Sequence, residues 1–323
     1  MLDRLFLSLL LSSALLQGSS RVRVRTMDGS EMEAQTDLRS VRIEVAGKTS
    51  DYRLADILSI HNGAEASEFE GGRIALDLAA IQAADRKARD RAVEELTSIG
   101  LPVVTPLLKA LKDTDQHEPR PLYRLFERVM PSQADGFDRT LTLIRLKNGE
   151  AVRGKLPEGT VEVRAANQPA TSLPWSKIRS LAVQQRLVRR SAPVHSLKHS
   201  TRIEYLDTGI VLTTTSKVDS TARGFVRLSW NDDGWASDAD GLKKPGSPSY
   251  KTNLVDGQPF GALLGRAGAD GDVFVLGKKA TKTGLPAGRL NLAVNDNAHW
   301  QNNVGSYSVS LTATDAYDVG DAQ

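Results

Sequence analysis

Alternating apolar and charged residues mark the first part of the chain as β structure. The stretch "RVRVRTMDGSEMEAQ", residues 21–35, has the two-residue period of a half-buried strand and reaches Asp28-Gly29, a pair that favours a hairpin turn. The stretches "SVRIEVAG" and "YRLADILSI" continue the strand pattern. We therefore predict a small β module over residues 21–62.

The same pattern returns roughly 120 residues later, which indicates an internal repeat. "LTLIRLKNGEAVRGKL" turns at Asn148-Gly149, "TVEVRAA" supplies a further strand, and "WSKIRSLAV" parallels "LADILSIHN". A second copy is predicted over residues 139–184. Each copy has room for four or five short strands, which suits a small open barrel or curled sheet. Neither copy carries visible chemistry, so we expect packing and contact with protein partners as their roles.

Between the two copies the apolar period lengthens to that of a helix. In "RKARDRAVEELTSIGLPVVTPLLKALKD" one helical face carries Ala88, Ala92, Leu96 and Ile99. Gly100 ends this helix and Pro102 begins the next, which predicts an antiparallel hairpin flanked by helices in "IALDLAAIQAAD" and "PLYRLFERV". The stretch "AVEELTSIGLPVVTPLLKALKD" resembles one HEAT-type repeat within a helical segment over residues 73–131. Because such arrays usually need three or more repeats, we expect a helical insert that packs on neighbouring sheets.

A basic stretch separates the second copy from the C-terminal part of the chain. No acidic residue occurs from residue 163 to residue 203, while the basic residues there are Arg164, Lys177, Arg179, Arg186, Arg189, Arg190, Lys198 and Arg202. "QQRLVRRSAPVHSLKHS" predicts a solvated basic linker over residues 185–201. The alternative is attraction to an anionic polymer or lipid surface, which would weaken steeply with salt.

The remaining residues, 202–323, have no helical period. Short apolar runs in "GFVRLSW", "FGALLGRAG", "DVFVLG", "GRLNLAVND" and "GSYSVSLTA" alternate with turn residues, as in an antiparallel sandwich or jelly roll. The predicted fold class is multi-domain and mainly β. Two small β-barrel or curled-sheet modules flank an α-helical hairpin, and a C-terminal β-sandwich follows.

Composition and charge narrow the classes of partner that the chain can bind. The chain has 323 residues with 40% hydrophobic content and a formal net charge of +3, so it is globular and has no overall field that would favour nucleic acid. The apolar run Leu5–Leu16 is too short to span a bilayer but fits the core of a signal peptide. We predict a signal peptide over residues 1–20, cut after Ser20, and export to the periplasm, the cell envelope or the medium. An uncleaved membrane anchor is the alternative.

Signatures of enzymes are absent from the sequence. It contains no G-x-S-x-G, P-loop, H-E-x-x-H or Rossmann fingerprint, and the lack of cysteine excludes thiol catalysis and thiolate metal sites. His195 and His199 have the spacing of helical metal ligands but lie in the predicted linker. We therefore expect a protein that is not an enzyme.

Oxygen ligands for Ca²⁺ are the remaining chemical resource. "DADG" at 238–241 and "ADGD" at 269–272 have some likeness to calcium loops, yet neither continues to the glutamate of an EF-hand. The stretch "NDNAHWQNN" differs, because one carboxylate, Asp296, and two consecutive carboxamides, Asn302 and Asn303, occur between two predicted strands.

Four motifs, in order, give the last domain a resemblance to the bacterial calcium-dependent galactose-binding lectins of the LecA type. These are "DTGI" at 207–210, "GWAS" at 234–237, "FGALLGRAG" at 260–268 and "NDNAHWQNNVGSYSV" at 295–309. The resemblance implies a small jelly roll in which Ca²⁺ bridges protein and sugar, with sugar hydroxyls completing the coordination shell.

The same resemblance implies the ligands of the metal. Asp296 would bind through its carboxylate, Asn302 and Asn303 through side-chain carbonyl oxygens, and Asp238 through its backbone carbonyl. A further backbone carbonyl would come from His299 or Trp300, because the loop is one residue shorter than is usual in the family. The sugar would contact Asp296, Asn302 and Trp300.

The loop that carries the sugar-contacting histidine and glutamine of the family reads "LKKPGSPSYKTNLVDGQP" here, without histidine. The sequence thus supports Ca²⁺ better than galactose, and a ligand with vicinal hydroxyls, such as a galactose-containing glycan, is expected. Two hypotheses remain open: a calcium-dependent lectin, or an envelope scaffold that binds Ca²⁺ only for stability and docks proteins through its β modules and helical hairpin.

Overall fold

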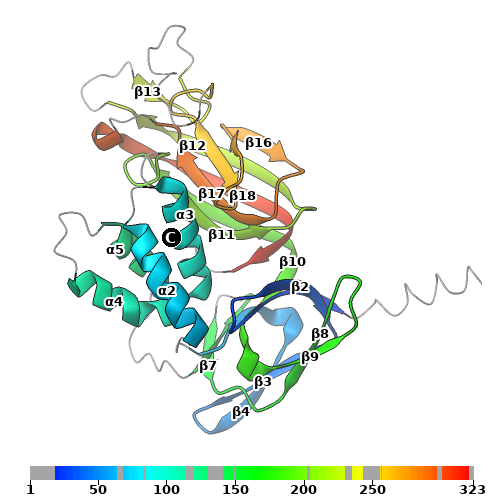
Figure 1. The fold of residues 1–323 in the computed structure, drawn as a ribbon. Helices are drawn as coiled ribbons and strands as arrows, with labels where there is room; N and C mark the ends of the chain where they lie inside the picture. The colour runs from blue at the N-terminus through cyan, green and yellow to red at the C-terminus, as the bar shows by residue number, and fades with distance from the viewer. Residues whose placement is uncertain are drawn as a thin grey trace, which may run out of the picture. The chain divides into compact units, whose positions relative to one another are not determined.

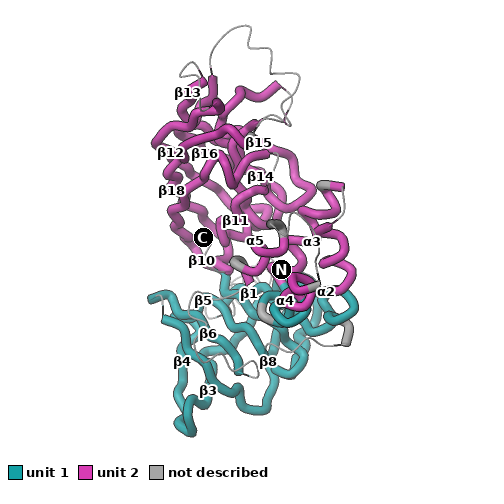
Figure 2. Tube along the Cα trace, turned by 90° about the vertical axis from the view of Figure 1, so that its left-hand side faces the viewer, with its two compact units in different colours: residues 1–74, 99–106, 132–184 teal, residues 75–98, 107–131, 185–323 magenta. Residues whose placement is uncertain are grey.

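The computed structural model describes residues 19–63, 68–82, 85–113, 120–129, 141–148, 150–201, 204–229, 235–242, 255, 257–296 and 300–319. The chain forms two compact units (Figure 2). Unit 1 comprises residues 1–74, 99–106 and 132–184, and unit 2 comprises residues 75–98, 107–131 and 185–323. The mainly β, multi-domain fold class with a helical hairpin in the middle is confirmed (Figure 1). The predicted signal peptide lies outside the described residues except for its last two positions.

Unit 1 contains the strands of both repeat copies. Copy 1 comprises β1 (Ser20–Thr26), β2 (Glu31–Thr36), β3 (Ser40–Val45), β4 (Lys48–Arg53), the short helix η1 (Leu54–Asp56) and β5 (Ile57–His61). Copy 2 comprises β6 (Thr142–Leu146), β7 (Ala151–Gly154), β8 (Thr160–Ala165), β9 (Thr171–Pro174), η3 (Trp175–Lys177) and β10 (Ile178–His195). The element order is the same in both, as the internal repeat predicts.

The two copies interlock instead of forming two modules. The hairpin β1–β2 closes on β10 of the other copy, and β6–β7 closes on β5 of the first copy. The registers are equivalent, because Val24 pairs with Leu181 and Ile144 pairs with Ile60. Strands β5 and β10 pair with each other through Ile60 and Leu181. Unit 1 therefore has a pseudo-twofold arrangement around these two residues.

The prediction of two separate β modules is thus wrong. The hairpin that begins each copy has an edge with unpaired backbone groups, and the closing strand of the other copy covers that edge. One shared core results, to which both copies contribute buried valine, leucine and isoleucine side chains. The pairs Gln35↔Arg164 and Glu44↔Lys155 join the two copies at equivalent positions and follow the same pseudo-twofold relation. At Gly154 an added Cβ would lie 2.3 Å from the Glu44 carbonyl oxygen, so this close approach requires glycine.

The predicted turns are local and have the expected chemistry. The Asp28 carboxylate accepts hydrogen bonds from the Thr26 hydroxyl and, at 3.0 Å, from the Ser30 N–H. These bonds lower the pKa of Asp28. In copy 2 the Asn148 side-chain oxygen accepts the Glu150 N–H at 3.0 Å. In both turns the side chain accepts a hydrogen bond from the backbone N–H two residues later in the chain. This is the reason why Asp and Asn favour such turns.

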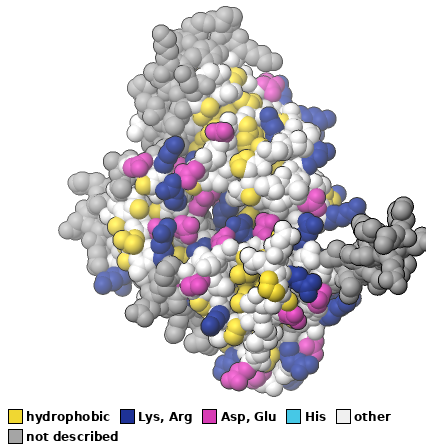
Figure 3. All heavy atoms as spheres, turned by 45° about the vertical axis from the view of Figure 1, so that its right-hand side comes forward, with side chains coloured by type: hydrophobic (Ala, Val, Ile, Leu, Met, Phe, Trp, Pro, Cys, Tyr) yellow, Lys and Arg dark blue, Asp and Glu magenta, His cyan; other side chains and the backbone are white. Residues whose placement is uncertain are grey.

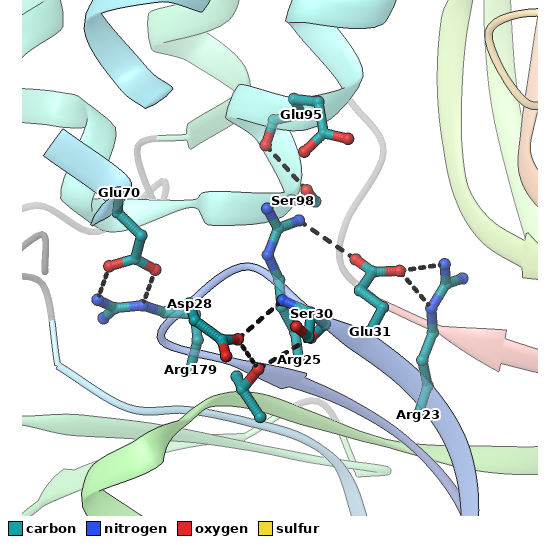
Figure 4. A network of polar contacts seen from close by, with 10 residues as sticks. Arg23, Arg25, Asp28, Ser30, Glu31, Glu70, Glu95, Ser98 and Arg179 are labelled. Carbon is teal, nitrogen blue, oxygen red and sulfur yellow. Dashed lines mark hydrogen bonds and ion pairs between the residues drawn. The ribbon is translucent and has the colours of Figure 1, made fainter. Parts of the chain in front are cut away.

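A buried ion pair breaks the symmetry of unit 1 (Figure 4). The Arg179 guanidinium on β10 donates to both carboxylate oxygens of Glu70, with Nε 2.6 Å from Oε1, and both side chains are almost fully buried. Nη1 of Arg179 also donates to the Asn62 carbonyl oxygen at 2.7 Å. Glu70 lies near the start of helix α2 (Glu68–Ile81). The two-pronged bond therefore attaches the start of α2 to β10.

The helical segment forms as predicted in its main elements. Helix α3 (Arg86–Ile99) is followed by η2 (Leu101–Val103), α4 (Val104–Asp113) and α5 (Arg120–Val129). Gly100, with φ of 75°, ends α3. Helix α2 begins at Glu68, earlier than the predicted start at residue 73. The HEAT-type repeat stays a prediction. Among the described residues, no helix combines the length and the apolar character needed to cross a membrane.

Unit 2 contains a sandwich of antiparallel strands. They are β11 (Leu206–Leu212), β12 (Lys217–Arg227), β13 (Ala236–Ser237), β14 (Leu263–Ala267), β15 (Val273–Val275), β16 (Lys279–Lys282), β17 (Gly288–Val294) and β18 (Val304–Asp318). One sheet has the order β15–β14–β17–β11, and the other joins β16, β12, β18 and β10. A single buried cluster contains apolar side chains from both sheets.

Strand β18 takes part in both sheets. Its first part pairs with β12 from Val304 to Thr314, and its end pairs with β11 at Tyr317 and Asp318. Between these parts Asp315 has φ of 53°, a left-handed conformation that bends the strand. The carbonyl oxygen of Asp315 accepts the Ser216 hydroxyl at 2.9 Å.

The predicted linker over residues 185–201 is wrong for most of its length. β10 continues as a strand to His195. Val188, Ala192 and Val194 are buried in the core of unit 2, while Arg189 and His195 are exposed. Arg189 thus lies on the solvent face of an alternating strand, whereas Arg190 lies on the side of Val188 and Ala192 and pairs with Asp318. The many charges concealed the two-residue period.

Candidate functional site

The loop between β17 and β18 brings together two of the predicted metal ligands. Asp296 follows β17 and Asn303 precedes β18, and the Asn303 side-chain N–H donates to the Asp296 carboxylate. Asp296 is fully buried and Asn303 is 4% exposed. A carboxylate and a carboxamide therefore converge where the two strand ends meet.

The end of the predicted linker supports this loop. The Thr201 hydroxyl lies 3.0 Å from the backbone nitrogen of Asp296 and accepts its hydrogen. The Ser196 carbonyl oxygen accepts the Asn303 side-chain N–H at 3.2 Å. Sequence reasoning missed both residues, because they lie about 100 residues before the loop and nothing local connects them with it.

Two carboxamide oxygens of the loop have no hydrogen-bond partner. In the part of the chain that the structure describes, the buried side-chain oxygens without a partner are those of Ser220, Asn295 and Asn303. An unpartnered buried oxygen is costly, by about 1–3 kcal/mol. A cation beside Asp296 would satisfy the Asn303 oxygen, so these residues fit a hard metal ion such as Ca²⁺.

The Asp238 backbone carbonyl oxygen accepts hydrogen bonds from the Ser237 hydroxyl at 2.8 Å and from the Gly241 N–H at 3.0 Å, and it lies beside the Tyr307 hydroxyl. The Tyr307 hydroxyl lies 2.8 Å from the carbonyl oxygens of Asp238 and of Gly261 and is positioned to donate to either. Burial raises the pKa of Tyr307 well above its ordinary value, so the phenol stays protonated. Gly261 in turn donates its N–H to the Asn295 carbonyl oxygen at 2.8 Å. Tyr307 thus connects Asp238 with the residue before Asp296.

The other predicted ligands are only partly placed. Asn302 is half-buried in the short helix η6 (Trp300–Asn302). Trp300 begins η6, but its side chain lies outside the described residues, as does His299. Most of the loop that corresponds to the sugar-binding loop of the lectins, residues 243–254, also lies outside them.

The two loops with a likeness to calcium loops have counter-charges from the protein. Lys278 Nζ lies 2.6 Å from the Asp238 carboxylate and 3.7 Å from that of Asp240, and the Asp238 bond raises the pKa of Lys278. Asp270 of "ADGD" pairs with Arg91 at 2.8 Å. These carboxylates therefore do not need a metal ion for charge balance.

His195 and His199 lie near each other without a third metal ligand among the described residues. The rings of His195 and His199 have centroids 6.1 Å apart, and the His195 backbone N–H donates to Nδ1 of His199. No group of three or more His, Asp or Glu side chains suited to a metal occurs among the described residues. On the face drawn in Figure 3, basic and acidic side chains are interspersed, in keeping with the small net charge.

Comparisons with known proteins add a limited likeness. No protein-family model matches the chain, and no curated protein matches it. Among solved structures, the chain is similar to one described as "EclA N-terminal domain; PllA-like lectin". The identity is 20%, the match covers 39% of this chain and 96% of that chain, and the TM-score is 0.31.

Proposed function

We propose that this protein is an exported, non-catalytic carbohydrate-binding protein whose sandwich domain uses Ca²⁺ to hold the sugar. The contact between the buried Asp296 carboxylate and Asn303, whose side-chain oxygen has no partner, carries the proposal. Ca²⁺ prefers such carboxylate and carboxamide oxygens.

In this proposal Asp296, Asn302 and Asn303 bind the ion through side-chain oxygens. The Asp238 carbonyl, and that of His299 or Trp300, would add backbone oxygens. Ca²⁺ takes six to eight oxygen ligands, so vicinal sugar hydroxyls can complete the shell. Asp296, Asn302 and Trp300 would contact the sugar, and galactose-containing glycans are the first class to test.

Thermal unfolding with and without Ca²⁺ tests the metal. Saturation to about 100 times the dissociation constant should stabilise the folded state by about 2.7 kcal/mol, and chelator should reverse the shift. Asp296→Ala and Asn303→Ala should remove the response. Asp270→Ala is the matched control, because this carboxylate pairs with Arg91. A calorimetric titration without Ca²⁺ uptake by the intact chain would exclude the metal site.

A glycan array with and without Ca²⁺ tests the sugar. We expect glycan binding that chelator abolishes and that Asp296→Ala removes. Turnover of any bound glycan would contradict the non-catalytic assignment.

The second candidate is a structural role, in which Ca²⁺ only stabilises the sandwich of an envelope scaffold. The burial of Asp296 and Asn303 favours this role, because buried metal ligands can stabilise the fold without leaving the ion accessible to a sugar. A thermal shift with Ca²⁺ together with no response to any glycan would support this role.

A further inference from the structure

An exposed cluster of apolar and basic side chains lies on the outward face of the β12–β18–β10 sheet, beside the candidate metal loop. Phe225 is 60% exposed, Val304 54% and Leu197 45%. Val304 directly follows Asn303 in the sequence. This cluster thus begins at the residue after a proposed metal ligand.

The strand registers determine which residues are neighbours. Phe225 pairs with Ser306, and Arg227 pairs with Val304, so these four side chains share one face. Ser191 on β10 lies beside Ser310, with the two hydroxyl oxygens 3.5 Å apart.

The same β10–β18 register continues to Ser196, whose N–H donates to the Gly305 carbonyl oxygen. His195 consequently lies beside Ser306, and Phe225 lies on the other side of Ser306, on β12.

Around Phe225, the charged side chains among the described residues of this cluster are arginines. Arg223 and His195 are exposed, and Arg227 is half-exposed. On the same face of β10, Arg189 is also exposed, but it lies level with Asp219, because the register that places Ser191 beside Ser310 places Arg189 beside Thr312, the partner of Asp219. The acidic residue of this face, Asp219, lies farther along β12 and pairs with Lys217 at 3.1 Å. In between, the side chains that β18 presents on this face are serine and threonine, which carry hydroxyl groups and little bulk.

We propose that this face binds an anionic polysaccharide whose chain continues from the metal site along the sheet. Phe225 supplies an aromatic surface for a sugar ring, and the exposed Arg223 pairs with a carboxylate or sulfate group. The inference rests on the proposed function, because the metal site supplies the starting point of the chain.

The test compares oligosaccharides of matched length with the full chain. Hexamers of galacturonate, of sulfated galactose and of neutral galactose are titrated in calorimetry with Ca²⁺ present. The charged hexamers should bind about tenfold more tightly than the neutral one at low salt, and the difference should shrink as ionic strength shortens the screening length. The preferred charged hexamer identifies the anionic group.

Variants assign the effect to this face. Arg223→Ala and Phe225→Ala should each weaken binding of the charged hexamer by about three- to tenfold and leave the Ca²⁺-dependent thermal shift unchanged. Arg21→Ala, an exposed arginine of β1, is the matched control and should have no effect.

The outcomes separate this inference from the proposed function. Equal binding of charged and neutral hexamers, or a Phe225→Ala variant that binds normally, overturns the inference even if Ca²⁺ binds. Preference for vesicles of phosphatidylglycerol over the hexamers would assign the face to a membrane and also overturns it. Arg223-dependent binding of charged hexamers that persists in chelator, without any Ca²⁺ response, supports the face and contradicts the metal-dependent function.

Discussion

At the scale of single residues, the Glu70–Arg179 pair is the strongest polar constraint in unit 1. Both side chains are removed from water, and the guanidinium also bonds the Asn62 carbonyl oxygen. A buried pair of this kind gives little net stability over apolar residues, but loss of one partner leaves an uncompensated group. It defines where α2 begins relative to β10.

We expect Glu70→Gln to lower the free energy of unfolding by about 3–5 kcal/mol, because the Arg179 charge stays buried without its carboxylate. Chemical denaturation measures this. Arg42→Ala, which breaks the exposed pair with Asp51, should change stability little. The double variant Glu70→Leu, Arg179→Met should cost less than Glu70→Gln; a larger loss would show that the pair itself stabilises the fold.

Tyr307 is the second residue on which a prediction depends. Tyr307→Phe keeps the ring but leaves the Asp238 and Gly261 carbonyl oxygens without its hydroxyl, which should cost about 1–3 kcal/mol in unfolding free energy. If Asp238 ligates the metal, calorimetry should also show weaker Ca²⁺ binding. Unchanged affinity in the folded variant would exclude support of the site by Tyr307.

At the scale of elements, α3 packs on the β14–β17 sheet through its charged face (Figure 1). Asp90 pairs with Arg266 at 3.1 Å, and the Glu94 carboxylate accepts the Ala269 N–H at 2.9 Å. Burial raises the pKa of Glu94, although Arg289 and Arg266 oppose the shift. The helix thus belongs to the packing of unit 2.

The raised pKa of Glu94 predicts that its contribution to the free energy of unfolding decreases as pH rises. The folded state binds the proton more tightly than the unfolded state, whose value is near 4.5. The contribution to stability is therefore present below that pH and is lost as pH rises through the folded-state value. The unfolding free energy of the natural protein minus that of Glu94→Gln should fall over this range in denaturation at several pH values. A difference that rises with pH would contradict the assignment.

At the scale of the whole molecule, the interlocked repeat makes each copy incomplete. Both the β1–β2 and the β6–β7 hairpins depend on a closing strand from the other copy. The core is also shared. We therefore expect that a single copy does not fold as a monomer.

We expect residues 20–63 alone, or residues 141–184 alone, to give an NMR spectrum with little dispersion of the amide chemical shifts at low concentration. Dispersion should appear only where two identical copies dimerise, because each can supply the closing strand for the other. The full chain is the control. A dispersed spectrum from a monomeric copy would show that the exchange of closing strands is not required.

The sequence predicted those parts of the fold that depend on near neighbours. The turn at Asp28, the end of α3 at Gly100 and the strands of the sandwich follow from short-range chemistry and periodicity. It also identified Asp296 and Asn303, which are close in the chain and in contact. Their roles as metal ligands stay predictions.

The sequence by itself determined which face of each strand is buried, because apolar and polar residues alternate along the strand. It also determined that a repeat exists, because the same pattern occurs twice. Only the tertiary structure decided that the closing strands are exchanged, that β10 continues through the predicted linker, and that Ser196 and Thr201 support the loop at Asp296. The physical reason is that a two-residue period fixes which face is buried but leaves open which strand lies alongside.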